Sequence, residues 1–192
     1  MQFEKSLFIF RRDLRLSDNL ALLEACKKSQ SVIPCFFFDP RQLTPHPYRS
    51  ETGLHFLFNS LEELDGELQK LGSQLHCFHS IPEKIIAAVI NEFRANAIFS
   101  SKDYTPFSRK RDDALSKECS KLGVDYYSVA NLLLNEPESI RSQAGTPYTV
   151  YTFFAKAAAQ NLVAKPITKI PDNLGLIKKI SLPAAFSIKQ AK

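Results

Sequence analysis

Three short segments of this chain place arginine, aspartate or tyrosine directly after a run of apolar residues. Arg11 and Arg12 follow the first run, Asp39 follows the second, and Asp103 with Tyr104 follows another. Arginine can stack on a ring system or pair with an acidic group, and a carboxylate accepts hydrogen bonds from N–H or O–H donors. If the fold brings these segments together, they suit a flat ligand with polar edges.

Several other chemistries have no matching pattern in the sequence. There is no GxGxxG after the first apolar run, no GxxxxGK[ST] and no GxSxG, so the common phosphate cradles and the nucleophile elbow are absent. The four histidines show no HExxH spacing, and we predict no metal site. No pair of carboxylates is placed by spacing as an acid and a base. The residues therefore favour ligand binding and name no catalytic group.

Two structural alternatives compete with the binding interpretation. Phe36 and Phe38 can be ordinary strand packing, because adjacent strand residues alternate faces and at most one of Phe37 and Phe38 shares a face with Phe36. The first polar segment can instead form an ion-pair network that fixes its own loop. That network would consist of Arg12, Asp13, Arg15 and Asp18.

The elements that must position these residues alternate between strands and helices. Apolar runs rich in aromatic and β-branched residues predict strands at Lys5–Phe10, Ser31–Phe38, Gln74–His79, Ala97–Ser100 and Val124–Val129. Amphipathic stretches predict helices at Asn19–Lys28, at Thr52–Leu71, from residue 80 onward and at Thr105–Leu122. This order predicts an α/β fold, a doubly wound, Rossmann-like, five-stranded parallel sheet in one three-layer domain. Ligands in such sheets bind beyond the carboxyl ends of the strands, where the polar segments lie.

Helix starts have recognisable signals in two places. Ser17 or Asp18 is available to cap the first helix. Ser80 and Glu83 have the spacing of a capping box at the third, and Pro82 suits a first helical turn.

Beyond residue 130 the pattern loosens. We expect the α/β domain over residues 1–130, a loop and a terminal helix over 131–162, and a proline-bearing connector over 163–192. Residues 155–192 hold seven lysines and one aspartate, whereas the whole chain has a net charge of +5, so residues 1–154 are close to neutral. This distribution favours a solvated C-terminal linker over autonomous DNA binding.

Cysteine usage and hydropathy indicate the cellular compartment of the protein. The four cysteines form no CxxC pair and lie in apolar stretches, which is typical of small buried side chains in a reducing compartment. No apolar run approaches the roughly 18 residues of a membrane helix, and the first residues lack a secretory pattern. We expect a cytoplasmic protein without a membrane partner.

Five segments in order resemble the DNA photolyase/cryptochrome family. Residues 8–19 read FIFRRDLRLSDN and are similar to its opening signature, and residues 36–40 read FFFDP like its second strand. Residues 57–64 are similar to its long helix and residues 103–112 to its fourth-strand motif. Residues 145–152, GTPYTVYT, resemble its Gly-x-Pro-Tyr-x-Val segment.

The resemblance implies the N-terminal antenna-chromophore domain of a deoxyribodipyrimidine photolyase, a lyase and flavoprotein that uses light to repair pyrimidine dimers in DNA. Its partners would be its own C-terminal helical domain, which binds FAD, and damaged DNA through that domain. We expect this chain to lack repair activity by itself, as a truncated photolyase or a free-standing relative of the antenna domain. The antenna-binding residues implied by the family are Arg11, Arg12, Phe36, Phe38, Asp39, Asp103 and Tyr104.

Departures from the family pattern concern the antenna. Phe107 and Ser108 stand where folate-binding members carry Asn-Glu, so the resemblance implies a deazaflavin or a flavin in preference to a folate. Gly53 stands where an antenna-facing arginine is usual, and no tryptophan follows Thr152, so weak binding or absence of an antenna is a further alternative. The alternatives are a stand-alone nucleotide- or flavin-binding module and a cryptochrome-type blue-light sensor without repair activity.

Overall fold

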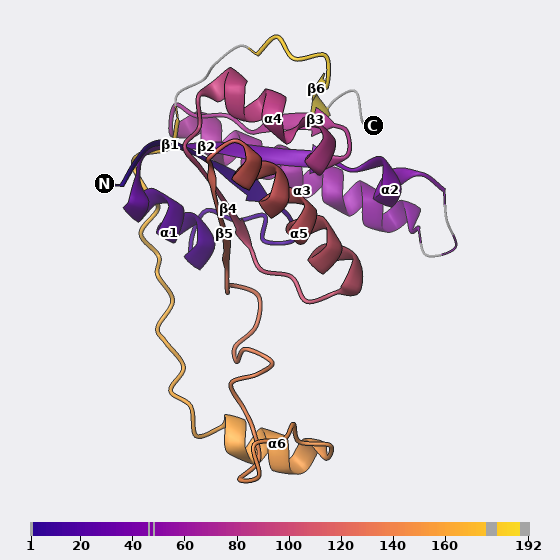
Figure 1. Ribbon diagram of the computed structural model, residues 1–192, viewed down its shortest axis with the longest axis vertical. Helices are drawn as coiled ribbons and strands as arrows, with labels where there is room; N and C mark the ends of the chain where they lie inside the picture. Colours follow the sequence, from indigo (N-terminus) through magenta and orange to yellow (C-terminus); the bar gives the residue numbers. More distant parts are fainter. Residues whose placement is uncertain (1, 46, 48, 176–179, 189–192) are drawn as a thin grey trace.

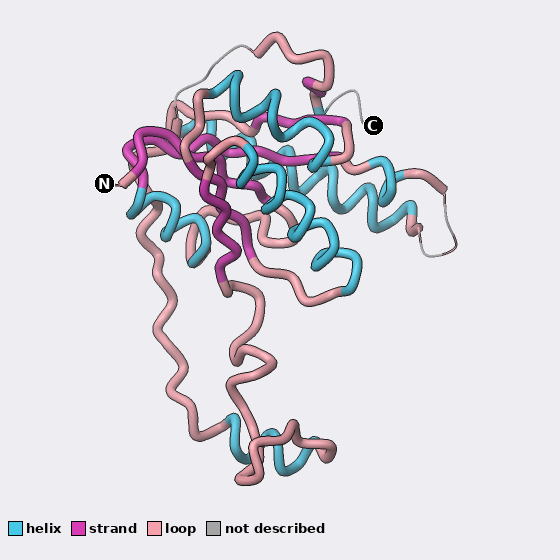
Figure 2. The backbone as a smooth tube through the Cα atoms, in the orientation of Figure 1, coloured by secondary structure: helices cyan, strands magenta, loops and turns pink. Residues whose placement is uncertain are grey.

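The protein is represented by a computed structural model that describes all residues except 1, 46, 48, 176–179 and 189–192. Its centre is one sheet with the strand order β5-β4-β1-β2-β3-β6 (Figures 1 and 2). The first five strands are parallel, as predicted: β1 Phe3–Phe10, β2 Ser29–Phe38, β3 His76–His79, β4 Ala97–Ser101 and β5 Asp125–Val129. The sixth, β6 Ala185–Phe186, was not predicted and runs antiparallel to β3.

Helices cover both faces of the sheet, which confirms the doubly wound fold. They are α1 Leu20–Lys28, α2 Pro40–Leu43, α3 Glu51–Lys70, α4 Pro82–Phe93, α5 Pro106–Lys121 and α6 Tyr151–Ala158. Helices α1 and α3 pack on one face and α4 and α5 on the other, each through its apolar stripe. The four-residue helix α2 follows β2 directly and helps to frame the strand ends.

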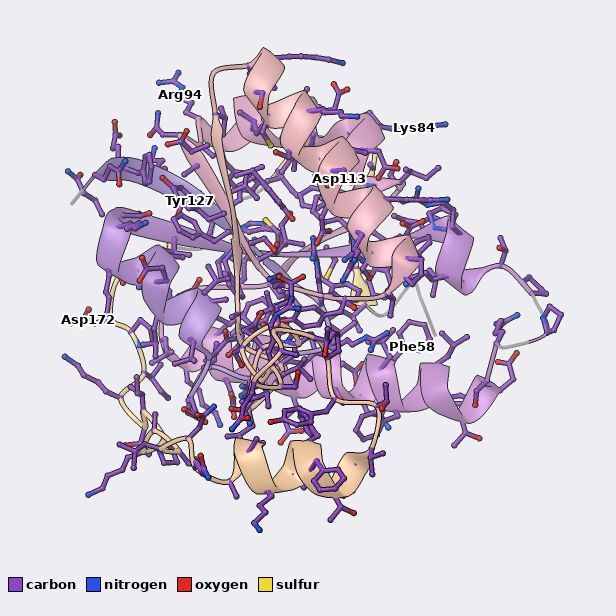
Figure 3. All side chains as sticks on the ribbon, turned by 60° about the horizontal axis from the view of Figure 1, so that its bottom comes forward. Phe58, Lys84, Arg94, Asp113, Tyr127 and Asp172 are labelled. Atoms are coloured by element: carbon purple, nitrogen blue, oxygen red, sulfur yellow. The ribbon has the colours of Figure 1, made fainter. Side chains whose placement is uncertain are left out.

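Alternation along the two central strands divides the core into two halves. On β1, Phe8 joins the core under α1 and α3, whereas Leu7 joins the core under α4 and α5. Phe58 of α3 and Tyr127 of β5 (both labelled in Figure 3) pack in the first of these halves. The Tyr127 ring stacks on Phe99 with a ring separation of 4.7 Å. Because both faces are covered, these strands read as continuous apolar runs in the sequence.

Two predicted helix caps are wrong. Helix α1 is capped by Asn19, whose side-chain oxygen accepts from the Leu22 N–H at 3.1 Å, while Asp18 takes a left-handed backbone with φ 50°. The Asn19 amide also donates to the Asp13 carboxylate at 3.1 Å, so the same side chain caps α1 and holds the first loop. Helix α4 has Ile81 at its N-cap and no side-chain cap, because isoleucine has no hydrogen-bond acceptor. Glu83 pairs with Arg41.

Part of the C-terminal segment adds to the edge of the sheet. Asn173 donates to the carbonyls of Cys26 and Ser29, and Leu174 is buried beside Val32. Val32 lies in the part of β2 before Cys35, where the pairing of β2 with β3 begins. In contrast, α6 and the loops around it extend away from the sheet (Figure 1), and α6 has no buried residue. None of the helices in the described part of the chain is long and apolar enough to cross a membrane.

Candidate ligand-binding site

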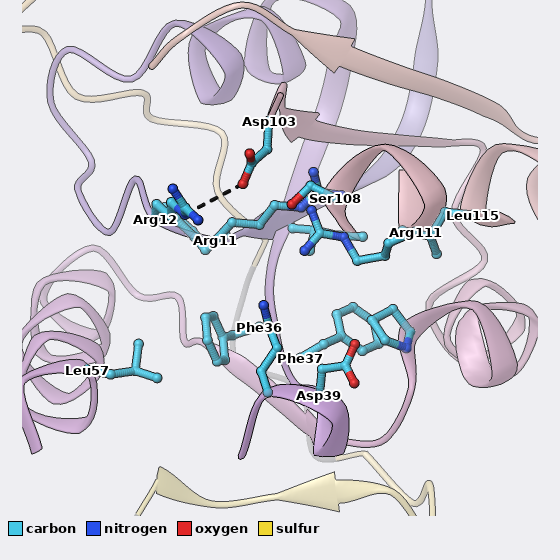
Figure 4. A pocket seen from close by; sticks show the side chains of 14 residues that line it. Arg11, Arg12, Phe36, Phe37, Asp39, Leu57, Asp103, Ser108, Arg111 and Leu115 are labelled. Carbon is cyan, nitrogen blue, oxygen red and sulfur yellow. Dashed lines mark ion pairs between the residues drawn. The ribbon is translucent and has the colours of Figure 1, made fainter. Parts of the chain in front are cut away.

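A pocket of about 150 Å³ opens at the carboxyl ends of β1 and β2, beside the loop that leads from β4 to α5 (Figure 4). Strands β1 and β4 lie where the chain reverses its direction across the sheet, the usual position of a ligand in this architecture. The fold therefore brings the three polar segments together. Five of the residues implied by the family line this pocket: Arg11, Arg12, Phe36, Asp39 and Asp103.

Arg11 is held by the protein itself. Its guanidinium contacts both oxygens of Asp112, at 2.7 and 2.9 Å, the Ser101 carbonyl at 3.1 Å and the Tyr126 hydroxyl at 3.0 Å. Burial opposes its charge, but Tyr126 and Asp112 outweigh that effect and raise the pKa of Arg11. Arg11 thus forms a fixed, charged wall whose donors are largely used.

Arg12 and Asp103 form the exposed side of the pocket. The Arg12 Nε lies 3.5 Å from an Asp103 oxygen, and the Arg12 side chain is 68% exposed (Figure 4). Burial works to raise the pKa of Asp103, but hydrogen bonds from the Thr105 backbone N–H and from Ser108 outweigh it. The Arg12 charge adds to these bonds, so the pKa of Asp103 is lowered and the carboxylate stays ionised.

Asp39 is buried and already bound within the protein. It caps α2 by accepting from the Arg41 backbone N–H at 2.9 Å, and it also accepts from the Arg41 side chain at 2.6 Å. Arg41 then pairs with Glu83 of α4 at 2.6 Å. Asp39 therefore shapes the pocket floor, and its lone pairs are mostly taken.

Phe38 and Tyr104 do not line the pocket. Phe38 is 1% exposed and packs against Phe58 and Phe186, with ring separations of 5.9 and 5.4 Å. Tyr104 borders a neighbouring polar hollow of about 650 Å³ and donates a short hydrogen bond to Glu136. Burial, followed by the Glu136 contact, raises the pKa of Tyr104.

Arg111 lines the pocket, although it was not among the residues predicted to bind the antenna. It shares the inward face of α5 with Ser108 and Leu115, and all three line the pocket. Its Nε donates to Asp112 at 3.1 Å, whereas its Nη2 is buried and has no hydrogen-bond partner among the described residues. The helical spacing of positions 108, 111 and 115 is the signal that could have revealed it. Further lining residues that were not predicted include Phe37, Gln42 and Leu57.

The first loop is fixed by hydrogen bonds, not by the ion-pair network considered as an alternative. Asp13 is 1% exposed and accepts from the Arg11 backbone N–H at 3.1 Å, from Asn19 at 3.1 Å and from Asn131 at 3.3 Å. Ser101 of β4 adds a short hydrogen bond to the same carboxylate. This cluster ties the end of β1 to β4 and to the segment after β5, so it positions Arg11 and the residue that follows it.

The match to a known family rests on most of the chain. A family model described as DNA photolyase matches residues 6–172. The chain belongs to the DNA photolyase family. It corresponds to the N-terminal α/β domain of photolyases, and N-terminal domains of this family are known for binding an antenna chromophore.

Individual relatives agree with this membership. A deoxyribodipyrimidine photo-lyase of Synechococcus sp. strain ATCC 27144 is 33% identical over 96% of this chain and 39% of its own length. An uncharacterised 31.6 kDa protein of Synechococcus sp. strain PCC 6716 is 31% identical over 98% of this chain and 67% of its length. The crystal structure of a Sulfolobus tokodaii photolyase superposes with a TM-score of 0.84 and 35% identity, over 97% of this chain and 40% of that one. The chain thus spans about two fifths of the length of these two photolyases.

Proposed function

We propose that the pocket at the ends of β1 and β2 binds the ring system of a flavin or deazaflavin antenna, as part of a light-driven DNA photolyase. The observation that carries the proposal is the buried, unpartnered Nη2 of Arg111 in a pocket that combines aromatic and aliphatic side chains with charged ones. A buried donor without a partner is unfavourable, and an acceptor on a ligand would satisfy it.

The size and composition of the pocket fit one end of such a ligand. Complete small-molecule sites usually enclose about 300–1,000 Å³, and this pocket encloses about 150 Å³. It can therefore cover a ring edge while the polar tail stays outside. Phe36, Phe37 and Leu57 offer apolar surface for the ring. Arg111 offers a charged donor at the ring edge, and Arg11 adds a fixed positive charge beside it. Such a pigment absorbs light and passes the energy to a second cofactor.

Two observations support a flavin-type ring over a folate. The Sulfolobus tokodaii photolyase was crystallised with two FAD molecules, which implies a novel light-harvesting cofactor in that protein. In this chain Ser108, at a position where folate-binding members carry a larger acidic residue, lines the pocket and is buried. A small side chain there leaves room beside α5 for a wide ring.

The wider activity is part of the same proposal. Residues 1–130 would form the antenna domain, residues 131–162 a loop and helix, and residues 163–192 the connector to a helical domain that binds FAD and damaged DNA. The free, buried cysteines agree with a cytoplasmic setting. The exposed apolar residues of α6, such as Tyr151 and Phe153, are suited to packing against that further domain.

Ligand titrations test the proposal. The chain is mixed separately with FMN, FAD, 8-hydroxy-5-deazariboflavin, methenyltetrahydrofolate and ATP, and both ligand fluorescence and the melting temperature are followed. A flavin or the deazaflavin should bind one to one and raise the melting temperature. If only ATP or only the folate does so, the proposal is wrong.

A pair of neighbouring variants locates the binding. Leu57 lines the pocket, whereas Phe56, the preceding residue on α3, is 75% exposed. Leu57→Trp should obstruct the pocket and weaken flavin binding at least tenfold. Phe56→Trp should leave binding unchanged. Equal affinities in the two variants would place the ligand elsewhere.

A further inference from the structure

The three arginines that line the pocket differ in burial and in how their donors are used. Arg12 is 68% exposed and pairs with Asp103. Arg11 is 9% exposed and makes four polar contacts within the protein. Arg111 is equally buried at 10%, yet it hydrogen-bonds only Asp112, and its Nη2 has no partner within the described residues. The pocket therefore has one buried donor position that the protein leaves open.

The surroundings of Arg111 restrict what can reach that donor. Ile9, Phe37 and Leu115 line the same pocket and are 3%, 7% and 1% exposed. The Phe107 ring lies 5.9 Å from the guanidinium carbon, on the helix that carries Arg111. A phosphate would lose most of its hydration among these apolar walls. A carbonyl oxygen on an aromatic ring loses much less, and the ring gains apolar contact.

The electrostatics of Arg111 agree with a missing acceptor. Burial, followed by repulsion from Arg11, lowers the pKa of Arg111, and the contacts with Asp112 do not fully compensate. Asp112 is shared, since it also binds Arg11. An acceptor oxygen at Nη2 would stabilise the charged guanidinium in the bound state.

We propose that Arg111 determines the orientation and the ring specificity of the antenna: its Nη2 donates a hydrogen bond to a carbonyl oxygen on the pyrimidinedione edge of the ring. The ring enters edge-first, and its ribityl or phosphate tail remains near the exposed Arg12. This inference rests on the proposed function. It also gives a role to a residue of the fourth-strand motif that was not among the predicted antenna-binding residues.

The test compares riboflavin with FMN, which share the ring and differ in the phosphate. Dissociation constants are measured for the wild type, Arg111→Met, Arg111→Lys, Arg12→Met and Lys110→Met. Lys110 is exposed, neighbours Arg111 on α5 and does not line the pocket, so it serves as the matched control. A hydrogen bond from a charged donor in a buried site supports a loss of about 10- to 100-fold. Arg111→Met should lose that much for both ligands, Arg12→Met should weaken FMN alone, and Lys110→Met should bind like the wild type.

A vibrational measurement reports the hydrogen bond directly. The carbonyl stretch of bound riboflavin, measured by Raman difference spectroscopy, should lie lower in the wild type than in Arg111→Met. Arg111→Lys keeps the charge beside Asp112 but shortens the donor, so it should fold normally and still shift the carbonyl band upward. This readout would not change if Arg111 only supported the fold.

The possible failures are distinguishable. If the wild type binds neither riboflavin nor FMN, the proposed function fails and the role of Arg111 fails with it. If the wild type binds both and the Arg111 variants bind equally well with an unchanged carbonyl band, only the role of Arg111 is refuted. If the Arg111 variants lose affinity for FMN but not for riboflavin, Arg111 contacts the phosphate and the proposed orientation is wrong.

Discussion

Asp112 is the acidic residue on which the charge balance beside the pocket depends. It contacts Arg11 at 2.7 Å and Arg111 at 3.1 Å, and its own side chain is 13% exposed. Replacing it by alanine leaves two guanidinium groups, 9% and 10% exposed, without their counter-charge. Removing one partner of a buried ion pair costs about 3–5 kcal/mol, because the remaining charge stays desolvated. Since two cations lose the same partner, we expect Asp112→Ala to lie at the upper end of that range.

Urea denaturation followed by circular dichroism measures this loss. With a slope of about 2 kcal/mol per molar urea, a loss of about 5 kcal/mol lowers the midpoint by about 2.5 M. The matched control is Asp113→Ala, which removes an exposed carboxylate from the next position on α5 (labelled in Figure 3). Exposed substitutions of this kind usually change stability by about 0.5 kcal/mol or less. If the Asp112 and Asp113 variants unfold at the same urea concentration, the two arginines do not depend on Asp112 and the reasoning is refuted.

Three further predictions concern separate parts of the domain. Phe38 is buried in the core and lies outside the pocket. Urea denaturation of Phe38→Ala should therefore show a loss of about 3–5 kcal/mol in stability, while the flavin dissociation constant stays unchanged. A large loss of affinity with normal stability would contradict this. The folded-state pKa of Asp103 is lowered, so its stabilisation is complete above its unfolded pKa of about 3.9 and is lost as pH falls through the lower folded value. The stability of wild type should therefore decline over that acid range more steeply than that of Asp103→Asn, and parallel pH curves would count against it. Burial raises the thiol pKa to about 12 for Cys26, about 12 for Cys77 and about 11 for Cys119. A thiol reagent at pH 8 should therefore label these cysteines far more slowly in the native protein than in urea. Fast labelling of the native protein would contradict this.

The sheet and the position of the site could be predicted because they depend on local patterns. Continuous apolar runs predicted five parallel strands, and the polar residues that follow three of them meet at one edge. β6 was missed because a two-residue strand has no periodicity, and its pairing with β3 depends on a contact between distant segments. For the same reason Asn131, which bonds Asp13 across more than a hundred residues, had no signal in its own neighbourhood.

Within the site, the errors follow from how side chains project. Phe38 lies on the same face of β2 as Phe36, but α3 and β6 cover it, so sharing a face did not place it in the pocket. Phe37 points to the opposite face and still borders the pocket, because the pocket lies at the end of the sheet where both faces meet. Arg111 lies within the motif of residues 103–112, but placing it in the pocket required following the inward face of α5.

A crystal structure of the chain grown with saturating FMN is the most direct test that this rim of the sheet is the pigment site. We predict ring density between Phe36, Phe37 and Arg111, with a ring oxygen within hydrogen-bonding distance of the Arg111 guanidinium. Flavin density in the polar hollow beside Tyr104, or an FMN-free pocket closed by its own side chains, would contradict the assignment.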